Sequence, residues 1–286
     1  MNQVIVIGCG PAGVSAALYT KRAGLATKII GSNKTALFKA EKIENYYGFK
    51  EPVNGVQLFK EGIEQAKRLG CNVIEDEVIS IANESNFKIK TATNGEFIGA
   101  AVILATGKQR FAPNIAGLKE FEGRGVSYCA ICDAFFYRNK KVAVIGNGAY
   151  AVSEAEELKA VADVTILTNG AASEEVKLSG IPYLDLGIDN IYGEAKVNGV
   201  GFKNGQTLTV SGVFVAIGSA SSIDFAKKLG LFVGNNRIIA DAKQQTNYPG
   251  IFAAGDCCAA LSQVCVAVAQ GAVAGLSAVE FIRNKV

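Results

Sequence analysis

An α/β fold built from two similar units is predicted by three observations. Residues 3–7 form an apolar strand that leads into a glycine-rich turn, GCGPAG at 8–13, and then into a helix. The same order begins again with a strand at 141–145 and the turn GNGAYA at 146–151. The length of 286 residues allows about two domains. Together these features predict two dinucleotide-binding-type, Rossmann-like domains.

The first unit carries a complete G-x-G-x-x-G turn between two strands. The strand at 3–7 (QVIVI) is continuously apolar, as burial on both faces of a parallel sheet requires, and the next strand covers 26–30. Such glycines permit a tight bend, approach of a pyrophosphate and close helix–strand packing. We predict dinucleotide binding, with a merely structural turn as the alternative. The predicted contacts in the turn are Gly8, Gly10, Pro11, Ala12 and Gly13.

The acid that usually ends the second strand and binds the ribose is absent. Gly31 and Ser32 stand there, so ribose recognition would fall to the backbone or to Ser32. In the second unit, the helix continues to about Ala160 and a strand follows at 164–167. Later segments at 213–219 (VFVAIGS) and 251–256 (IFAAGD) repeat the strand-plus-turn form.

The composition excludes several kinds of chemistry. The sequence contains no His, which removes Ser–His–Asp triads, His-ligated metals and an imidazole pH switch. Acid–base work is left to carboxylates, Tyr, Lys or thiols. A net charge of +3 is too small to indicate a nucleic-acid partner. The first strand lacks the features of a secretory signal, so we predict a cytoplasmic protein without a framework of structural disulfides.

An uncharged segment at 257–279 imitates a membrane span. Because it carries two Gln and many small residues, we predict a helix packed inside an α/β domain and no membrane partner. Cys9, Cys71 and Cys265 lie in apolar surroundings and are predicted to be small core residues.

A C-x-x-C motif, Cys129 to Cys132, is followed directly by Asp133. Two thiols at this spacing can form a disulfide across the first turn of a helix, and helix-terminal N–H groups lower the pKa of a thiol. Half a zinc site or two buried cysteines are the alternatives. A structural zinc site usually needs four ligands, and the chain has neither His nor a second C-x-x-C, so we predict no metal site.

Three blocks give the chain a resemblance to a known family. They are GCGPAG at 8–13, GRGVSYCAICDAFFYRNKKVAVIGNG at 123–148 and GIFAAGD at 250–256 with the Gln263-containing helix after it. Over nearly the whole chain these resemble low-molecular-weight thioredoxin reductases. The resemblance implies an FAD-binding domain split around an inserted NAD(P)-type domain that carries the C-x-x-C pair. It also implies a homodimer and an inserted domain that turns relative to the FAD domain. The boundaries we predict are 1–111 with 240–286, and 112–239, with hinges near 110–115 and 238–245.

The resemblance also assigns site residues. It makes Cys129 and Cys132 a redox-active pair with Cys132 nearer the flavin, and it leaves open which sulfur attacks the partner protein. It makes Asp133 the proton donor and acceptor for the thiols, whereas the plainer alternative is a helix-start acid that complements the helix dipole. The FAD contacts implied outside the first turn are Gly31, Ser32, Asn45, Val78, Ala105, Thr106, Gly107, Gly255, Asp256, Gln263 and Val264.

The second glycine-rich turn departs from the NADPH-binding pattern of that family, G-G-G-x-[ST]-A followed by H-R-R-x-x-x-R. Asn147 and Tyr150 stand in the turn, and Glu174 and Glu175 follow the next strand. No Arg or His occurs between 139 and 236 to grip a 2′-phosphate. We therefore predict that this domain has lost pyridine-nucleotide binding.

The chain then resembles ferredoxin-linked flavin thioredoxin reductases most. That resemblance implies electron flow from reduced ferredoxin through FAD and the dithiol to thioredoxin. One alternative is an NAD(P)H- or deazaflavin-linked reductase with degenerate motifs. Another is a redox-inactive flavin-binding module, against which the intact C-x-x-C-D argues. Because ferredoxins are typically acidic, a basic docking face is expected, with an ordinary solvated surface as the alternative. The candidates for that face are Lys39, Lys42, Lys60, Lys67 and Arg68.

Overall fold

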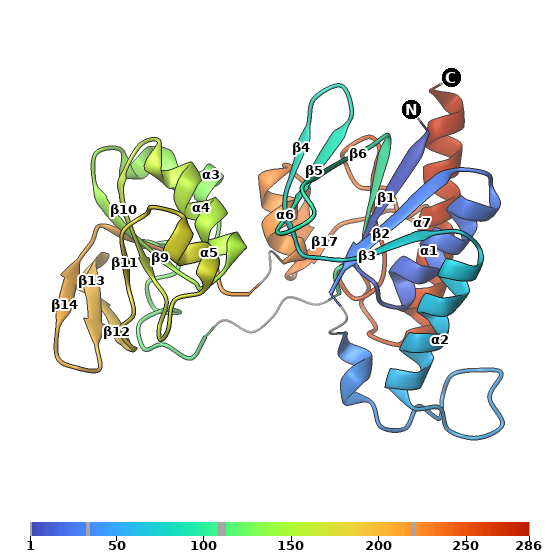
Figure 1. Cartoon of the computed structure of the whole chain (residues 1–286), viewed down its shortest axis with the longest axis horizontal. Helices are drawn as coiled ribbons and strands as arrows, with labels where there is room; N and C mark the ends of the chain where they lie inside the picture. The colour runs from blue at the N-terminus through green and yellow to red at the C-terminus, as the bar shows by residue number, and fades with distance from the viewer. Residues whose placement is uncertain (1, 33–34, 108–112, 219–220, 286) are drawn as a thin grey trace. The chain divides into compact units, whose positions relative to one another are not determined.

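The computed structural model describes residues 2–32, 35–107, 113–218 and 221–285. The chain divides into two compact units (Figure 1). Unit 1 consists of Met1–Gln109 with Ser221–Val286, and unit 2 consists of Arg110–Ala220. Both ends of the chain therefore belong to one unit and the other is inserted, which is the split arrangement that the family resemblance implied.

Unit 1 is built on a parallel five-stranded sheet with the order β18-β7-β1-β2-β3. Its strands are β1 (Gln3–Ile7), β2 (Ala26–Gly31), β3 (Asn72–Glu75), β7 (Ala101–Leu104) and β18 (Ile251–Ala253). An antiparallel meander precedes β7 and consists of β4 (Val78–Asn83), β5 (Phe87–Thr91) and β6 (Glu96–Gly99). Ile251 of β18 pairs with Val102 of β7, so segments from the two ends of the chain share one sheet.

The helices of unit 1 are α1 (Pro11–Arg22), η1 (Ala36–Lys39), α2 (Gly55–Arg68), α6 (Ser222–Lys228) and α7 (Val264–Asn284). Among them, α1, α2 and α7 lie beside this sheet (Figure 1). By length and hydropathy, α7 could span a membrane. It packs instead against α1, where Ser15 Oγ donates to the Val268 carbonyl at 2.7 Å and Gly271 lies against the Ala12 backbone. The predicted small-residue packing helix is confirmed, although it covers Val264–Asn284 and not 257–279.

Unit 2 repeats the layout with a parallel sheet of order β11-β10-β9-β15-β8. Its strands are β8 (Val126–Ser127), β9 (Lys141–Ile145), β10 (Asp163–Leu167), β11 (Tyr183–Leu184) and β15 (Gly212–Val215). The meander consists of β12 (Ile188–Gly193), β13 (Val197–Phe202) and β14 (Thr207–Thr209). The helices are α3 (Ala130–Asp133), η2 (Ala134–Tyr137), α4 (Ala149–Lys159) and α5 (Glu174–Leu178). A separate apolar core fills this unit.

One predicted boundary is wrong. We placed residues 221–239 in the inserted domain, but they belong to unit 1. This segment holds α6 and the short strands β16 (Val233–Gly234) and β17 (Arg237–Ile238). The Ile238 N–H donates to the Cys257 carbonyl at 2.9 Å, and the Phe232 N–H donates to Asn247 Oδ1 at 2.8 Å. These bonds attach the segment to unit 1. The chain therefore returns to unit 1 at Ser221, and not at the hinge predicted near 238–245. The first predicted boundary, 111/112, lies outside the described residues.

Candidate active site and cofactor site

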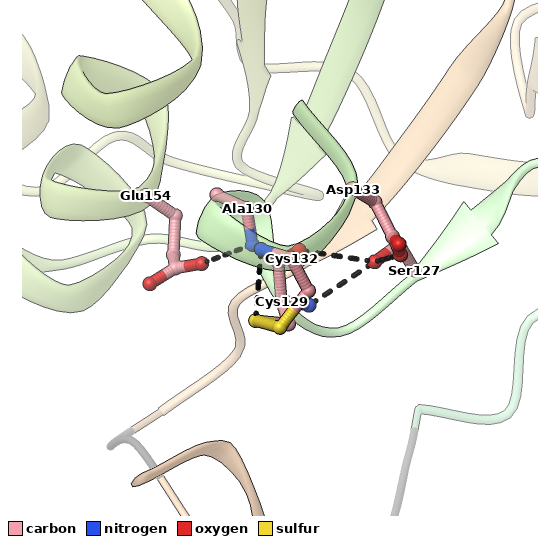
Figure 2. Close-up of a disulfide and its surroundings, with 6 residues drawn as sticks. All are labelled: Ser127, Cys129, Ala130, Cys132, Asp133 and Glu154. Carbon is pink, nitrogen blue, oxygen red and sulfur yellow. Dashed lines mark hydrogen bonds between the residues drawn. A yellow bond between two sulfur atoms is a disulfide. The ribbon is translucent and has the colours of Figure 1, made fainter. Parts of the chain in front are cut away.

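The structure joins Cys129 and Cys132 in a disulfide in unit 2 (Figure 2). The pair follows the short strand β8, which β15 holds in parallel register through Val213 and Phe214. Cys129 is the N-cap of α3 and is only 2% exposed, whereas Cys132 is exposed. The Cys132 N–H donates to Cys129 Sγ at 3.3 Å. An approaching group therefore reaches Cys132, while Cys129 holds the backbone donor that would stabilise a thiolate.

The Asp133 carboxyl is positioned by Ser127 (Figure 2). Ser127 Oγ donates to Asp133 Oδ2 at 2.6 Å and accepts from the Cys129 N–H at 3.1 Å. One hydroxyl thus links the amide of the first cysteine to the predicted acid–base group. Burial, and to a lesser extent the charge of Asp133, raise the pKa of the half-buried Tyr137. The Tyr137 hydroxyl therefore stays protonated at neutral pH.

A second carboxyl contacts the same loop from α4. The Ala130 N–H donates to Oε2 of the buried Glu154 at 2.9 Å (Figure 2). The sequence reasoning missed both Ser127 and Glu154. Neither has a motif of its own, because what they contact includes backbone amides that only the fold brings near.

Three apolar side chains that lie close to the disulfide in the sequence are exposed. Ile131, Phe135 and Phe136 are 62%, 74% and 67% exposed. The Arg138 guanidinium lies 5.8 Å from the centroid of the Phe135 ring. Apolar residues gathered next to a reactive group, rather than scattered singly, indicate a surface on which a protein partner docks.

The glycine-rich turn of unit 1 has the geometry of an anion site. A side chain on Gly8, whose φ is +116°, would run into the Ala105 carbonyl, and one on Gly13 would run into Gly8. A side chain on Gly10 would point into open space. Among the described residues, no side chain caps the start of α1, and its first turn holds no acid. These free N–H groups and the helix dipole suit a pyrophosphate.

Of the other predicted FAD contacts, Gly255 and Thr106 lie near this turn, and Asn45 and Gln263 contact each other. Gly255 lies against Ala12, since a Cβ on Gly255 would be 2.8 Å from the Ala12 Cβ. Asn45 Nδ2 donates to Gln263 Oε1 at 2.9 Å. Thr106 Oγ1 is buried and has no hydrogen-bond partner within the described part of the chain. An orphaned hydroxyl beside an open anion site fits a bound dinucleotide.

All of the predicted FAD contacts stay predictions. Gly107, Asp256 and Val264 follow Thr106, Gly255 and Gln263 in the chain, and Val78 is buried at the start of β4. The sequence analysis also missed Gln270, which accepts from the Gly255 N–H at 2.9 Å and so fixes the turn after β18.

The missing ribose acid has a steric explanation. A Cβ on Gly31 would lie 3.0 Å from both the backbone nitrogen and Sγ of Cys9, so an acidic side chain at position 31 would crowd Cys9 and require it to shift. Gly31 pairs with Glu75, an exposed acid at the end of β3. Burial, and then the charge of Glu75, raise the pKa of Cys9 to about 12.

The second glycine-rich turn is tied to the segment after β10. Asn147 Nδ2 donates to the Ala171 carbonyl, and the Ser173 N–H donates to Asn147 Oδ1, both at 2.6 Å. This segment is where the resemblance places the phosphate-gripping Arg residues. Tyr150 is almost completely buried and forms part of the packing of α4.

The other five cysteines are free. Cys9 and Cys71 are buried, as predicted, but Cys265 is exposed because it lies on the outer face of the first turn of α7. In the described ranges, no group of three or more His, Cys, Asp or Glu residues could hold a metal ion.

Two Rossmann-like units, each with a glycine-rich turn after a strand of its parallel sheet, and a disulfide in the second unit define a class: the two-domain flavin disulfide oxidoreductases. The family described as "Pyridine nucleotide-disulphide oxidoreductase" matches residues 2–271, and the chain belongs to it. FAD is the cofactor of this family and of this chain.

Named relatives place the chain among homologues of thioredoxin reductase. It is 35% identical to the thioredoxin reductase of Aquifex aeolicus, with 99% of this chain and 94% of that protein covered. It is also 35% identical to the Rickettsia prowazekii thioredoxin reductase, with 99% of each covered.

Two solved structures are similar over the full length. The atypical thioredoxin reductase TRi from Desulfovibrio vulgaris Hildenborough gives a TM-score of 0.92 at 38% identity, covering 100% of this chain and 99% of that one. A ferredoxin-flavin thioredoxin reductase from Clostridium acetobutylicum gives 0.72 at 31% identity, covering 99% and 98%.

Proposed function

We propose that this chain reduces thioredoxin with electrons from reduced ferredoxin and does not use NADPH or NADH. The observation that carries this proposal is the second glycine-rich turn. Asn147 bonds it to Ala171 and Ser173, and two acids begin α5 where Arg residues would bind a 2′-phosphate. Similarity to the ferredoxin-flavin thioredoxin reductase of Clostridium acetobutylicum supports the same donor here.

FAD, when bound, supplies the chemistry that collects electrons delivered singly and releases them as a pair. The residues we expect to hold it are the turn at 8–13, Thr106, Gly255 and Gln263. The uncapped start of α1 and the orphaned Thr106 hydroxyl carry this assignment.

The disulfide takes up two electrons and two protons and becomes two thiols. The exposed Cys132 then attacks one sulfur of the thioredoxin disulfide as a thiolate, forming a mixed disulfide and releasing one thioredoxin thiolate. The Cys129 thiolate, held by the Cys132 N–H, attacks the Cys132 sulfur, which restores the internal disulfide and releases the second thioredoxin thiolate. Asp133 gives and takes the protons that the sulfurs exchange.

The surface formed by Ile131, Phe135 and Phe136 suits the thioredoxin partner. These side chains are exposed and flank the sulfur that must reach the partner disulfide. Burying apolar area beside the reacting sulfurs would hold the two disulfides together during exchange.

An anaerobic titration tests the donor. The purified, FAD-loaded protein is mixed with reduced ferredoxin, NADPH or NADH, and the flavin absorbance is followed. We expect bleaching with reduced ferredoxin only, followed by free thiols at Cys129 and Cys132. Bleaching by NADPH or NADH would instead support the pyridine-nucleotide-linked alternative. Bleaching without thiol formation would support a redox-inactive flavin module.

A cytoplasmic homodimer is also part of the proposal, on the strength of the family resemblance. Unit 1 has a groove of about 1140 Å³ that is lined by residues of α1 and α2 and by the exposed aromatic residues Tyr47 and Phe49. A twofold dimer could bury both. Light scattering should give twice the chain mass, and Tyr47→Asp with Phe49→Asp should give the mass of one chain.

A further inference from the structure

Glu154 is a buried acid that the proposed chemistry does not use. It is 2% exposed, lies on α4, and accepts the Ala130 N–H at 2.9 Å. Figure 2 shows it on the opposite side of the cysteine pair from Ser127 and Asp133. The helix that carries it, α4, follows a glycine-rich turn without nucleotide-binding motifs. Its contact with the redox loop is therefore not explained by nucleotide binding.

We propose that Glu154 is a positioning residue that sets the equilibrium between the disulfide and dithiol forms of Cys129 and Cys132. The inference rests on the proposed function only in taking this pair as redox-active, and it does not depend on the electron donor. It concerns which backbone N–H groups are left to stabilise a thiolate.

Three N–H groups of the loop donate to acceptors that the structure identifies. The N–H of Cys129 donates to Ser127 Oγ at 3.1 Å, that of Ala130 to Glu154 Oε2 at 2.9 Å, and that of Cys132 to Cys129 Sγ at 3.3 Å. The first N–H groups of a helix have no partner within it. Glu154 therefore removes one of the donors that α3 would otherwise offer to the Cys129 sulfur.

Loss of that acceptor should favour the dithiol. In Glu154→Ala, the Ala130 N–H is free to donate to the Cys129 thiolate, and an acidic group beside the sulfurs is gone. Both changes stabilise the reduced form, which makes the pair less reducing toward thioredoxin. Glu154→Gln keeps a side-chain oxygen for the Ala130 N–H, so a role in positioning requires the glutamine variant to resemble the wild type.

The test equilibrates the full-length, FAD-loaded protein with reduced and oxidised dithiothreitol under argon. Thiols are then alkylated, and the 129–132 peptide is quantified by mass spectrometry. We expect Glu154→Ala to shift the equilibrium about tenfold toward the dithiol and Glu154→Gln by less than about threefold. The exposed Glu156 on the same helix provides the control Glu156→Ala, which should match the wild type.

A shift below about threefold in Glu154→Ala would overturn the proposal, and so would an equal shift in Glu154→Gln, because charge rather than the hydrogen bond would then be responsible. Flavin absorbance and the near-ultraviolet circular dichroism spectrum report whether each variant is folded. If Glu154→Ala does not fold, the glutamine variant decides: a tenfold shift there contradicts the proposal. A wild-type pair that dithiothreitol cannot reduce would contradict the proposed function itself.

Discussion

Asp133 lies where protons must move, and its carboxyl is held by a single hydroxyl. Ser127 Oγ donates to it at 2.6 Å while accepting the Cys129 N–H. The acid is therefore tied to the same short loop that carries both sulfurs. This arrangement favours a role in proton transfer over the plainer role of a helix-start acid.

Asp133→Asn should slow reduction of thioredoxin about a hundredfold, because general acid–base catalysis typically contributes a factor of that order. The rate of dithiol–disulfide exchange is measured by stopped flow on prereduced protein over a range of pH. Asp163→Asn, an exposed acid at the start of β10, is the control. An unchanged exchange rate at every pH would remove Asp133 from the mechanism.

The two cysteines should give different trapped species. With thioredoxin that lacks its resolving cysteine and carries thionitrobenzoate on the remaining one as a mixed disulfide, Cys129→Ser should form a covalent complex through the exposed Cys132 and release thionitrobenzoate. Cys132→Ser should give little complex, since Cys129 is 2% exposed. Non-reducing gels and mass spectrometry read the result, and the opposite pattern would reverse the assigned order of attack.

At this scale, the sequence predicted the residues that carry a motif. Cys129, Cys132 and Asp133 form a contiguous pattern, whereas Glu154 acts across 24 residues on a backbone amide. The sequence showed that Gly31 replaces the acid that would bind the ribose. Only the fold shows that Cys9 lies where a side chain at position 31 would begin.

Close packing of α1 on α7 holds the FAD-binding turn. A Cβ on Gly271 would lie 2.9 Å from the Ser15 Cβ and closer still to the Ala12 carbonyl. The turn at 8–13 leads directly into α1, so a displaced α1 would also displace its open N-terminus.

Gly271→Ala should lower the free energy of unfolding by about 1–3 kcal/mol and weaken FAD retention, because overpacking forces the helices apart. Gly62→Ala is the matched control on α2. Its Cβ would meet Val14 at 3.6 Å, so it should stabilise by about 0.5–1 kcal/mol. Urea unfolding distinguishes the two, and equal effects would contradict the packing account.

Asp76 connects the end of β3 to the β4–β6 meander. Burial raises its pKa, but bonds from the Asn94 side chain, Thr91 and the backbone outweigh this and lower the pKa to about 2. A group whose folded pKa is depressed stabilises above its unfolded pKa of about 4 and loses that contribution as the pH falls toward 2.

Asp76→Asn should therefore cost at least about 2 kcal/mol at pH 7, and its difference from the wild type should shrink below about pH 4. Equilibrium unfolding at several pH values measures this. Asp189→Asn, at an exposed site in unit 2, should show no such pH dependence. A constant difference across the range would show that the carboxylate charge contributes nothing.

Among the elements, long apolar strands were predictable and short ones were not. The strands at 3–7 and 141–145 coincide with β1 and β9 because continuous apolar runs reflect burial on both faces. The error at 221–239 came from a seven-residue helix and two-residue strands, which are too short for a periodic pattern.

Across the whole molecule, one layout occurs twice but serves two tasks. Each unit has a parallel sheet, a glycine-rich turn and an antiparallel meander. The turn of unit 1 is open to an anion, while that of unit 2 is bonded through Asn147 and its sheet supports the redox loop. The split of unit 1 around unit 2 came from the family resemblance, since no local pattern shows that two distant segments share a sheet.

Docking of an acidic electron carrier predicts a dependence on salt. The candidate cations on η1, α2 and the segment between them are all exposed, although Lys67 pairs with Glu64 at 2.9 Å. Raising NaCl from 50 to 500 mM should slow flavin reduction by ferredoxin about tenfold. Replacing Lys39, Lys42 and Lys60 with Glu should slow it at low salt.

Reduction of the disulfide by uncharged dithiothreitol should hardly change in either case, and it serves as the control. A rate of flavin reduction that is independent of salt would place ferredoxin docking elsewhere or rule out electrostatic steering.

The most direct test of the account is turnover in the complete system. Thioredoxin thiols are counted over time under anaerobic conditions with full-length, FAD-loaded protein and either reduced ferredoxin, NADPH or NADH, with Cys129→Ser as the blank. The account predicts steady thiol production with reduced ferredoxin and none above the blank with either nucleotide. Turnover with NADPH or NADH, or none with ferredoxin, would contradict it.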